Sequence, residues 1–216
     1  MERETIIYKG YEITTYYDQY AQSPREDGDM LGIIAYKHNK YVLGEEEIDD
    51  PIDWLEFMTG QEEKGIYNNE RLAELESIFF DMYYALPLYL YDHSGITIST
   101  SSFGCRWDSG KVGYIYTTKE RIKLLGAPED RIVSGLEGEI KEFNSYLTGE
   151  VYGYDSEAGG CWGFIDDDGY EYMIEQAKAE IDHLIEGKKR ERNKQLKTLI
   201  INKVPLAIRQ TKLQTV

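Results

Sequence analysis

The stretch that decides the fold is residues 89–116, YLYDHSGITISTSSFGCRWDSGKVGYIY. β-Branched and aromatic residues gather there in separate runs, and turn-forming residues divide the runs. The pattern predicts strands over residues 88–91, 95–100 and 111–116, with Asp92-His93-Ser94 joining the first two. Strands this close together in the sequence favour an antiparallel sheet.

The segments on either side of this stretch alternate between strand-like and helix-like patterns. Strand patterns predict three further hairpins, over residues 5–8 with 11–17, residues 31–36 with 41–43 (turning at His38-Asn39) and residues 150–154 with 161–165. Apolar spacing and caps predict helices over residues 52–58 (after Asp50-Pro51), 69–84 (stopped by Pro87), about 119–125, 128–147 and 170–197. The apolar tail 199–206 is expected to pack back on the body.

Domain organisation follows from the absence of any Ser-, Gly- or Pro-rich linker in the sequence. We therefore expect a single α+β domain over residues 1–216, with an antiparallel sheet, several short-to-medium helices and a long C-terminal helix. Within it the sequence falls into an acidic N-terminal half (1–84), a β-rich centre (85–165) and a C-terminal helix with a basic tail (169–216).

Charge is distributed unevenly along the 216 residues. The formal net charge is −16, yet residues 188–216 alone carry +8, so that the preceding chain carries −24. Such a body repels nucleic acid, because phosphate binding depends on Lys and Arg, and it favours a basic partner. The alternative interpretation is that the acidic excess only keeps the protein in solution. The basic tail is expected to be a solvated helix end or a dimer contact with an acidic neighbour.

Other functional classes are limited by the same composition. No run of about 18 apolar residues would span a membrane, and the first residues lack the features of a signal peptide, so a cytoplasmic location is expected. The two cysteines and three histidines lack the close spacing of a zinc site, and Asp166-Asp167-Asp168 lacks the spacing of a calcium loop. No phosphate-binding or dinucleotide motif is present, and we expect no metal and no cofactor.

A possible catalytic group lies within residues 89–116. A thiolate of Cys105 activated by His93, with Asp108 or Asp92 orienting the ring, would form a nucleophilic arrangement. No Gly-x-Ser-x-Gly elbow accompanies it, and Asp92-His93-Ser94-Gly95 is also typical of a tight turn. Both interpretations stay open from the sequence.

Acidic residues and tyrosines provide the alternative to catalysis. The 19 tyrosines exceed what a core needs, and tyrosine is favoured at protein interfaces. The candidate partner-binding residues are the acids of segment 45–81: Glu45, Glu46, Glu47, Asp49, Asp50, Asp53, Glu56, Glu62, Glu63, Glu70, Glu74 and Glu76.

Three sequence stretches resemble a family of uncharacterised proteins carried by phages and mobile elements. They are YDHSGITIST followed by Cys105 and WDSGKVGYIY, then GEVYGY with CWGF, and the tail Val204-Pro205-Leu206. The resemblance covers roughly residues 85–210 and implies a setting, an accessory gene expressed in a host cell. It implies no activity for any residue.

Three hypotheses follow from the sequence. The first is a non-catalytic binding protein of a phage or mobile element that inhibits a host defence nuclease (anti-CRISPR or antirestriction type), its carboxylates imitating nucleic-acid phosphates in a basic groove. The second is an enzyme that processes a small molecule or nucleotide with His93, Cys105 and Asp108. The third is a structural protein that self-assembles through its tyrosines.

Overall fold

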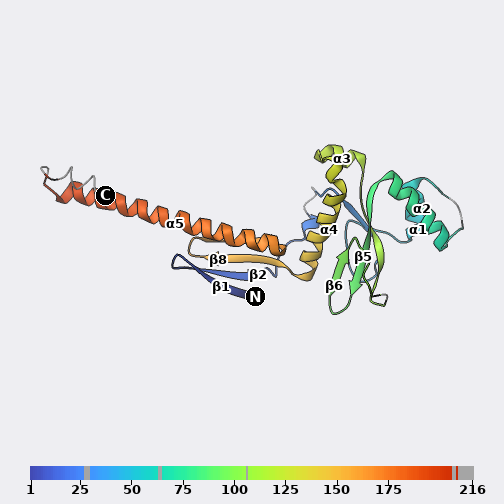
Figure 1. The fold of residues 1–216 in the computed structure, drawn as a ribbon, viewed down its shortest axis with the longest axis horizontal. Coiled ribbons are helices and arrows are strands. Elements are labelled where there is room, and N and C mark those ends of the chain that lie inside the picture. The colour runs from blue at the N-terminus through green and yellow to red at the C-terminus, as the bar shows by residue number, and fades with distance from the viewer. Residues whose placement is uncertain (27–29, 63–64, 106, 206–207, 209–216) are drawn as a thin grey trace. The chain divides into compact units, whose positions relative to one another are not determined.

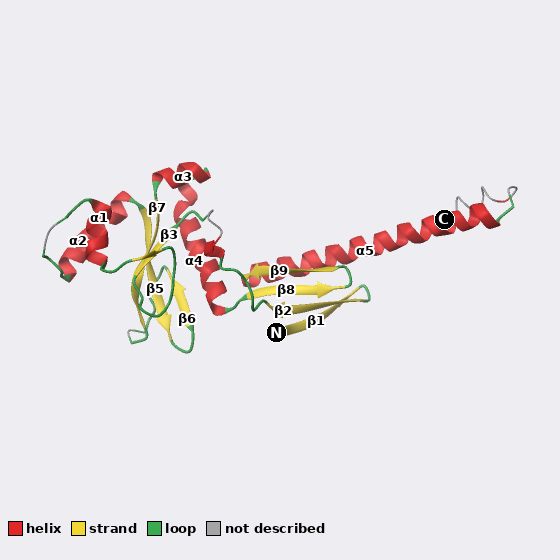
Figure 2. Cartoon of the chain, turned by 180° about the vertical axis from the view of Figure 1, so that it is seen from behind, coloured by secondary structure: helices red, strands yellow, loops and turns green. Residues whose placement is uncertain are grey.

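The computed structural model describes residues 1–26, 30–62, 65–105, 107–205 and 208. The chain forms two compact units, which we describe separately: unit 1 comprises Met1–Gln19 with Val151–Val216, and unit 2 comprises Tyr20–Glu150. Helices and largely antiparallel strands confirm the α+β class, and the long C-terminal helix is also confirmed (Figures 1 and 2). The strands form two sheets, one in each unit.

The sheet of unit 2 is built around the stretch 89–116. Its strand order is β4-β3-β7-β5-β6, with β3 Ile33–Tyr36, β4 Glu46–Glu47, β5 Tyr84–Asp92, β6 Ile96–Ser99 and β7 Ser109–Thr117. Adjacent strands are antiparallel except β3 and β4. The three strands expected from the stretch are therefore confirmed, and two of them begin earlier in the chain than the sequence pattern predicted.

Four helices belong to unit 2, together with two 3₁₀ turns. They are α1 Pro51–Thr59, α2 Asn69–Met82, α3 Lys119–Leu125 and α4 Ile132–Thr148, with η1 Pro24–Glu26 and η2 Glu129–Arg131. The Asp50 carboxylate accepts hydrogen bonds from the first backbone N–H groups of α1, and Gly60 ends that helix in the left-handed conformation, which glycine adopts at little cost.

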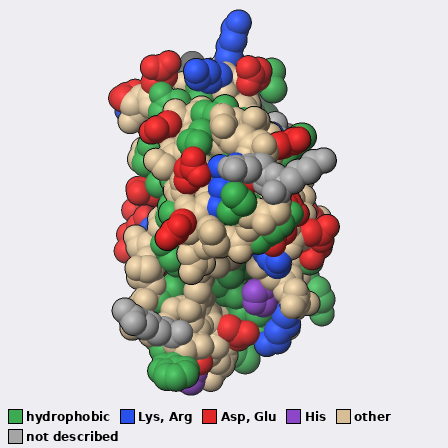
Figure 3. Space-filling model, turned by 90° about the vertical axis from the view of Figure 1, so that its right-hand side faces the viewer, with side chains coloured by type: hydrophobic (Ala, Val, Ile, Leu, Met, Phe, Trp, Pro, Cys, Tyr) green, Lys and Arg blue, Asp and Glu red, His purple; other side chains and the backbone are tan. Residues whose placement is uncertain are grey.

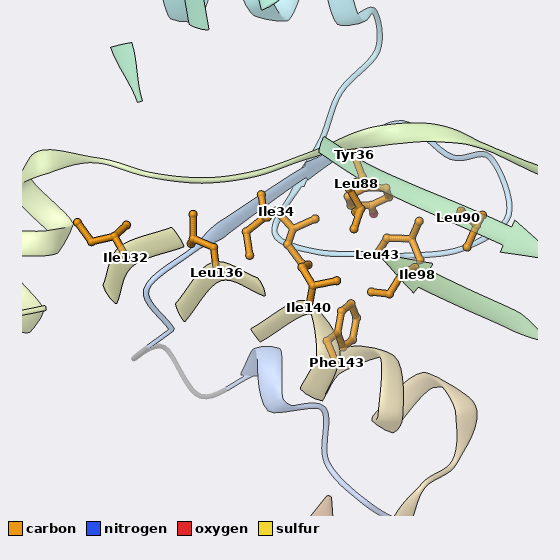
Figure 4. Packing of buried hydrophobic residues seen from close by; sticks show 11 residues of the cluster. Ile34, Tyr36, Leu43, Leu88, Leu90, Ile98, Ile132, Leu136, Ile140 and Phe143 are labelled. Carbon is orange, nitrogen blue, oxygen red and sulfur yellow. The ribbon is translucent and has the colours of Figure 1, made fainter. Parts of the chain in front are cut away.

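Both faces of the unit 2 sheet are buried. Because side chains alternate along a strand, Ile34 and Ile115 point to one face, whereas Ala35 and Tyr114 point to the other. The first face packs against Leu136, Ile140 and Phe143 of α4 (Figure 4). The second face packs against α1 and α2, through residues such as Leu55, Leu75 and Phe79.

Unit 1 is a four-stranded antiparallel sheet covered by one helix. The strand order is β1-β2-β8-β9, with β1 Glu2–Tyr8, β2 Tyr11–Tyr17, β8 Val151–Ser156 and β9 Gly159–Ile165, and the helix is α5, Asp166–Lys203. Met173, Ala177 and Ile181 of α5 are buried against the sheet. Lys9 and Gly10 both have positive φ, as a two-residue hairpin turn requires. The first and last predicted hairpins are thus confirmed.

The second predicted hairpin is wrong. Tyr41–Leu43 forms no strand, and β3 pairs instead with β7, more than seventy residues later, and with β4. Leu43 is apolar because it fills the core beneath α4, where it is completely buried. Its sequence pattern reflects packing and not strand pairing.

Pro87 does not end the second helix. Helix α2 stops at Met82, where the Tyr83 N–H bonds to the Phe79 carbonyl, and Pro87 lies within β5 opposite Tyr114. Strand β6 pairs only with the later residues of β5, so at Pro87 one side of the strand is an edge. Proline is tolerated at an edge because its missing N–H costs no ladder hydrogen bond there.

The far end of α5 also departs from expectation. Leu199 and Ile201 are about half exposed, at 48% and 47%, so these tail residues do not pack back on the body. Among the described residues, no helix has the length and apolar character needed to cross a membrane.

Candidate functional site

The cluster predicted for catalysis does assemble, at the end of the β5–β6 hairpin. The His93 Nδ1 lies 3.3 Å from the Asp108 Oδ2, and the Cys105 Sγ lies 3.8 Å from the same oxygen. The Asp92 N–H bonds to the Asp108 carbonyl and thereby fixes Asp108 beside the turn. Ser94 and Gly95 both have positive φ, which makes the segment from Asp92 to Gly95 a tight turn as well as part of this cluster.

The order of the three groups limits what this cluster can do. A nucleophilic thiol needs an imidazole in contact with it and a carboxylate behind the imidazole. Here the Asp108 carboxylate lies between Cys105 and His93. The His93 and Asp108 side chains are 64% and 39% exposed, so water reaches both. Cys105, His93 and Asp108 are the residue types of a catalytic triad. Here, however, the Asp108 carboxylate contacts the thiol, where the imidazole of His93 would have to act as the base.

Asp92, the other carboxylate of the hypothesis, does not orient His93. It accepts hydrogen bonds from Lys40 at 3.1 Å and from the Tyr41 hydroxyl at 3.2 Å. The Lys40 hydrogen bond holds the pKa of Asp92 below its ordinary value, with a smaller contribution from Tyr41. Asp92 is therefore a surface anchor for the 40–41 loop.

The sequence also raised two other kinds of site, a pairing of the two cysteines and a metal site. Cys105 and Cys161 are both free thiols, and they belong to different units. The described part of the chain holds no group of three or more His, Cys, Asp or Glu side chains placed to bind a metal ion. Arg106, next to Cys105, lies outside the described residues.

Most of the twelve acidic candidates have roles inside the fold. Seven accept hydrogen bonds from other groups of the chain, namely Glu45, Glu46, Asp50, Asp53, Glu56, Glu74 and Glu76. Glu56 is the most deeply placed, and its carboxylate binds Arg71, whose side chain is only 7% exposed. These acids stabilise loops and helix contacts, so fewer of the twelve carboxylates are left without a hydrogen bond inside the protein.

Some of the candidate acids are exposed around α1 and α2, including Asp53 and Glu74, which also accept hydrogen bonds within the fold. Asp49, Asp53, Glu62, Glu70 and Glu74 are exposed there, and Glu47 is exposed on the adjoining strand β4. Glu63 lies outside the described residues. Among the described residues of 45–82, Arg71 is the single base, and it is buried. The described exposed charges within segment 45–82 are thus negative, whereas Lys111 of β7, also exposed, bonds to Glu76 of α2.

Two aromatic side chains project among these acids. Phe57, one helical turn after Asp53, is 77% exposed, and Tyr67 is 62% exposed. The Tyr67 hydroxyl donates to the Asp53 carboxylate at 2.8 Å. This hydrogen bond, with the negative charges of Asp53, Glu56 and Asp50, raises the pKa of Tyr67.

We call this surface the α1–α2 acidic face: Asp49, Asp53, Glu62, Glu70 and Glu74 with Phe57 and Tyr67. Acidic side chains are spread over the view in Figure 3, with exposed hydrophobic side chains and some Lys, Arg and His side chains between them. Sequence reasoning found the acids but missed Phe57. The predicted helix over residues 52–58 could have identified Phe57 as exposed, since residues four apart share a helix face and Phe57 therefore lies on the same side as Asp53.

The basic region lies at the other end of the sequence, on α5. Lys188 donates to Glu157 at 2.5 Å, and the helix beyond it is exposed apart from Asn193 and Ile200, which are partly buried. Six of the residues from Lys189 to Lys203 are bases and one is an acid.

Comparison of the chain with protein-family models, curated proteins and solved structures finds no match.

Proposed function

We propose that the protein is a non-catalytic binding protein that engages a basic partner through the α1–α2 acidic face. One observation carries the proposal: exposed carboxylates share segment 45–82 with two exposed aromatic rings, one of them bonded to Asp53, and no described base of the segment reaches the surface. Contact between a large aromatic ring and water is unfavourable in the free protein. Burying the ring against a partner removes this contact and so contributes to the free energy of binding.

The exposed aromatic rings distinguish a binding surface from the alternative interpretation, in which the acids only keep the protein in solution. Acids that serve only to keep a protein in solution need no apolar side chains between them. Phe57 is not required by the core, because Leu55 and Ile52 of the same helix are the residues that pack inward. A central aromatic anchor with charges around it is the usual anatomy of a protein-binding surface.

We further propose that the partner is a nucleic-acid-binding groove, of which the carboxylates imitate the phosphates. A cationic groove has a high affinity for closely spaced negative charges, and such binding weakens steeply with salt. A host defence nuclease, in the cytoplasm of a cell that carries a mobile element, fits both the charge and the sequence resemblance described above. The body would then bind the nuclease in place of its substrate.

The test compares two variants of equal charge change in capture of partners from host lysate. The face variant combines Asp49→Asn, Glu62→Gln and Glu70→Gln, and the matched control combines Glu137→Gln, Glu171→Gln and Glu175→Gln on α4 and α5. We expect the wild type and the control to capture the same basic protein at low salt, with at least tenfold less recovered by the face variant. Added duplex DNA should release it. Equal loss in both variants would mean that only net charge matters, and DNA-resistant capture would exclude mimicry.

A second candidate, an enzyme using Cys105, has in its favour only that Cys105 and His93 both lie beside Asp108, since the carboxylate stands where the catalytic base would act. Its test is the alkylation rate of Cys105 by iodoacetamide, measured in a Cys161→Ser background. An activated nucleophile should react at least tenfold faster than glutathione at pH 7. A rate no faster than that of glutathione would remove the enzyme from consideration.

A further inference from the structure

A cavity of about 490 Å³ lies within unit 2, apart from both candidate sites. Its walls come from η1, from the loop that follows β3 and from the last turns of α4. Cavities of this volume accommodate small organic ligands. No sequence motif indicated it, because its lining is collected from three separated segments.

The side of the cavity formed by α4 is apolar and aromatic. Phe143, Tyr146 and Leu147 line it, and Val42 contributes from the opposite loop. The Phe143 and Tyr146 rings are stacked, with their centroids 6.1 Å apart and their planes at 13°. Phe143 is held in place by the core, where it is 4% exposed (Figure 4). This wall is therefore preformed.

The polar side of the cavity is a buried ion network centred on Arg25. The Arg25 side chain is only 6% exposed, and its Nε and Nη1 donate to Glu45 at 2.7 Å and Glu139 at 3.0 Å. Its Nη2 donates to the Gly32 carbonyl at 2.8 Å. Since all three guanidinium nitrogens already donate within the protein, Arg25 is a structural element of the wall and not a binding site for an anion.

The charge around the cavity is net negative. Among the described residues of the lining Arg25 is the one cation, against the lining carboxylates of Glu26 and Glu45 and the Arg25-bound carboxylate of Glu139. The last turn of α4 also lies here and contains no basic residue, and the C-terminal end of a helix carries a partial negative charge. Aromatic faces attract cations as well. Three independent features thus favour a positive ligand.

We propose that this cavity binds a small organic cation, an amine whose apolar or aromatic body packs on Phe143 and Tyr146 while its ammonium group lies toward Glu26, since both oxygens of Glu45 already accept hydrogen bonds from Arg25 and the Ile34 N–H. Glu26 is exposed at the polar side, and its backbone N–H, bonded to the Ser23 carbonyl, fixes it in η1. The proposal is independent of the α1–α2 acidic face, so either can fail without the other.

The experiment titrates the full chain with three probes that share a phenyl ring: 2-phenylethylamine, 2-phenylethanol and the slightly larger 3-phenylpropionate. Binding is followed by NMR shifts of the residues that line the cavity. We expect the amine to bind at least tenfold more tightly than the alcohol, and the carboxylate to bind most weakly. Equal binding of the three probes, or no saturable binding of the amine at millimolar concentration, would overturn the proposal.

Two variants connect the binding to this cavity. Val42 is 77% exposed, so Val42→Trp fills the cavity without disturbing the core and should reduce amine binding at least tenfold. Val133→Trp, at an exposed position of α4, the helix that forms the apolar wall, is the matched control and should leave binding unchanged. Glu26→Gln should weaken the amine about threefold and leave the alcohol unaffected. Full amine binding by Val42→Trp would show that the probe binds elsewhere.

Discussion

The two units cover their sheets differently. In unit 2 α4 packs on one face of the sheet and α1 with α2 on the other, so both faces are buried. Among the described residues of unit 1, α5 alone covers the sheet, and side chains such as Ile7 and Trp162 are left 68% and 52% exposed. Unit 2 should therefore depend on packing in two layers, and unit 1 on a single helix contact.

The largest effect is expected for Phe79→Ala in unit 2. Phe79 is completely buried, and its ring lies within 6 Å of the rings of Trp54, Phe80, Tyr83, Tyr114 and Tyr116. Deleting a buried aromatic ring leaves a cavity and costs about 4 kcal/mol of the free energy of unfolding. Urea denaturation measures the loss, and hydrogen exchange should locate it in unit 2. Equal loss of protection in unit 1 would show that both units unfold together.

A nearly equal effect is expected for Gly113→Ala, on β7. A Cβ at residue 113 would lie 2.0 Å from the Ala35 carbonyl oxygen and 2.8 Å from the Tyr36 Cα, so the backbones of β3 and β7 would have to separate. Overpacking of this kind costs about 3 kcal/mol. Gly138→Ala in α4 is the control, since no atom lies within 4 Å and alanine stabilises a helix by about 1 kcal/mol. Equal melting temperatures for the two variants would contradict the close approach of the strands.

In unit 1 the corresponding test compares two positions on α5. Ile181 is completely buried against the sheet, and Ile181→Ala should cost about 2.5 kcal/mol. Leu196, farther along the same helix, is 38% exposed, and Leu196→Ala should cost less than about 0.5 kcal/mol. Urea denaturation distinguishes the two. A large loss for Leu196→Ala would mean that the far end of α5 has a packing partner.

The same difference between the units explains which elements the sequence could predict. The hairpins of unit 1 are local and half-buried, so alternation and the Lys9-Gly10 turn were sufficient. Strand β3 is buried on both sides and pairs with residues far away in the chain, and its alternation with Tyr41–Leu43 suggested the wrong partner. Local patterns carry no information about such distant pairing.

The candidate sites follow the same rule. His93, Cys105 and Asp108 lie close in sequence, so their proximity could be predicted, whereas the position of the carboxylate between the other two could not. Glu45 and Glu56, both predicted partner-binding residues, bind Arg25 and Arg71 within the fold. A count of charges cannot reveal such pairing, because the bases involved lie fifteen or more residues away.

High pH should destabilise unit 2 through its buried tyrosines. Burial, reinforced by Glu76, raises the pKa of Tyr114 well above its ordinary value of 10, and burial with Glu46 does the same for Tyr116. The folded protein keeps these protons after the unfolded chain has lost them, so stability falls as pH rises above about 10. For Tyr114 the slope is about 1.4 kcal/mol per pH unit.

Tyrosine removal provides the measurement of this effect. Tyr114→Phe should lower stability at pH 8, because Glu76 loses a hydrogen bond at 2.5 Å, and should flatten the decline above pH 10. Urea midpoints between pH 8 and 11 give the slope. Unit 1 also contains a buried tyrosine with a raised pKa, Tyr154, so hydrogen exchange should find the loss in both units but steeper in unit 2. An unchanged slope in Tyr114→Phe would contradict the assignment.

The smallest effects on stability are expected for a feature that both units share, an exposed lysine–aspartate pair. In unit 2 Asp92 accepts from Lys40 at 3.1 Å and from Tyr41, and in unit 1 Asp182 accepts from Lys9 at 2.6 Å and from Tyr8. The lysine hydrogen bond is the main reason that each aspartate has a lowered pKa. The resulting stabilisation is present above the ordinary pKa of 3.8 and is lost as pH falls through the lowered pKa.

Lys9→Met and Lys40→Met should therefore raise the pKa of Asp182 and Asp92, respectively, as measured by carboxyl NMR titration. The tyrosine hydroxyl remains in each variant, so neither pKa should return fully to 3.8. The melting temperature at pH 7 should change little in either, because both pairs are open to water, which screens them. A clear drop in Lys9→Met alone would mean that unit 1, with one covered face, relies on its hairpin-to-α5 ion pair where unit 2 relies on packing.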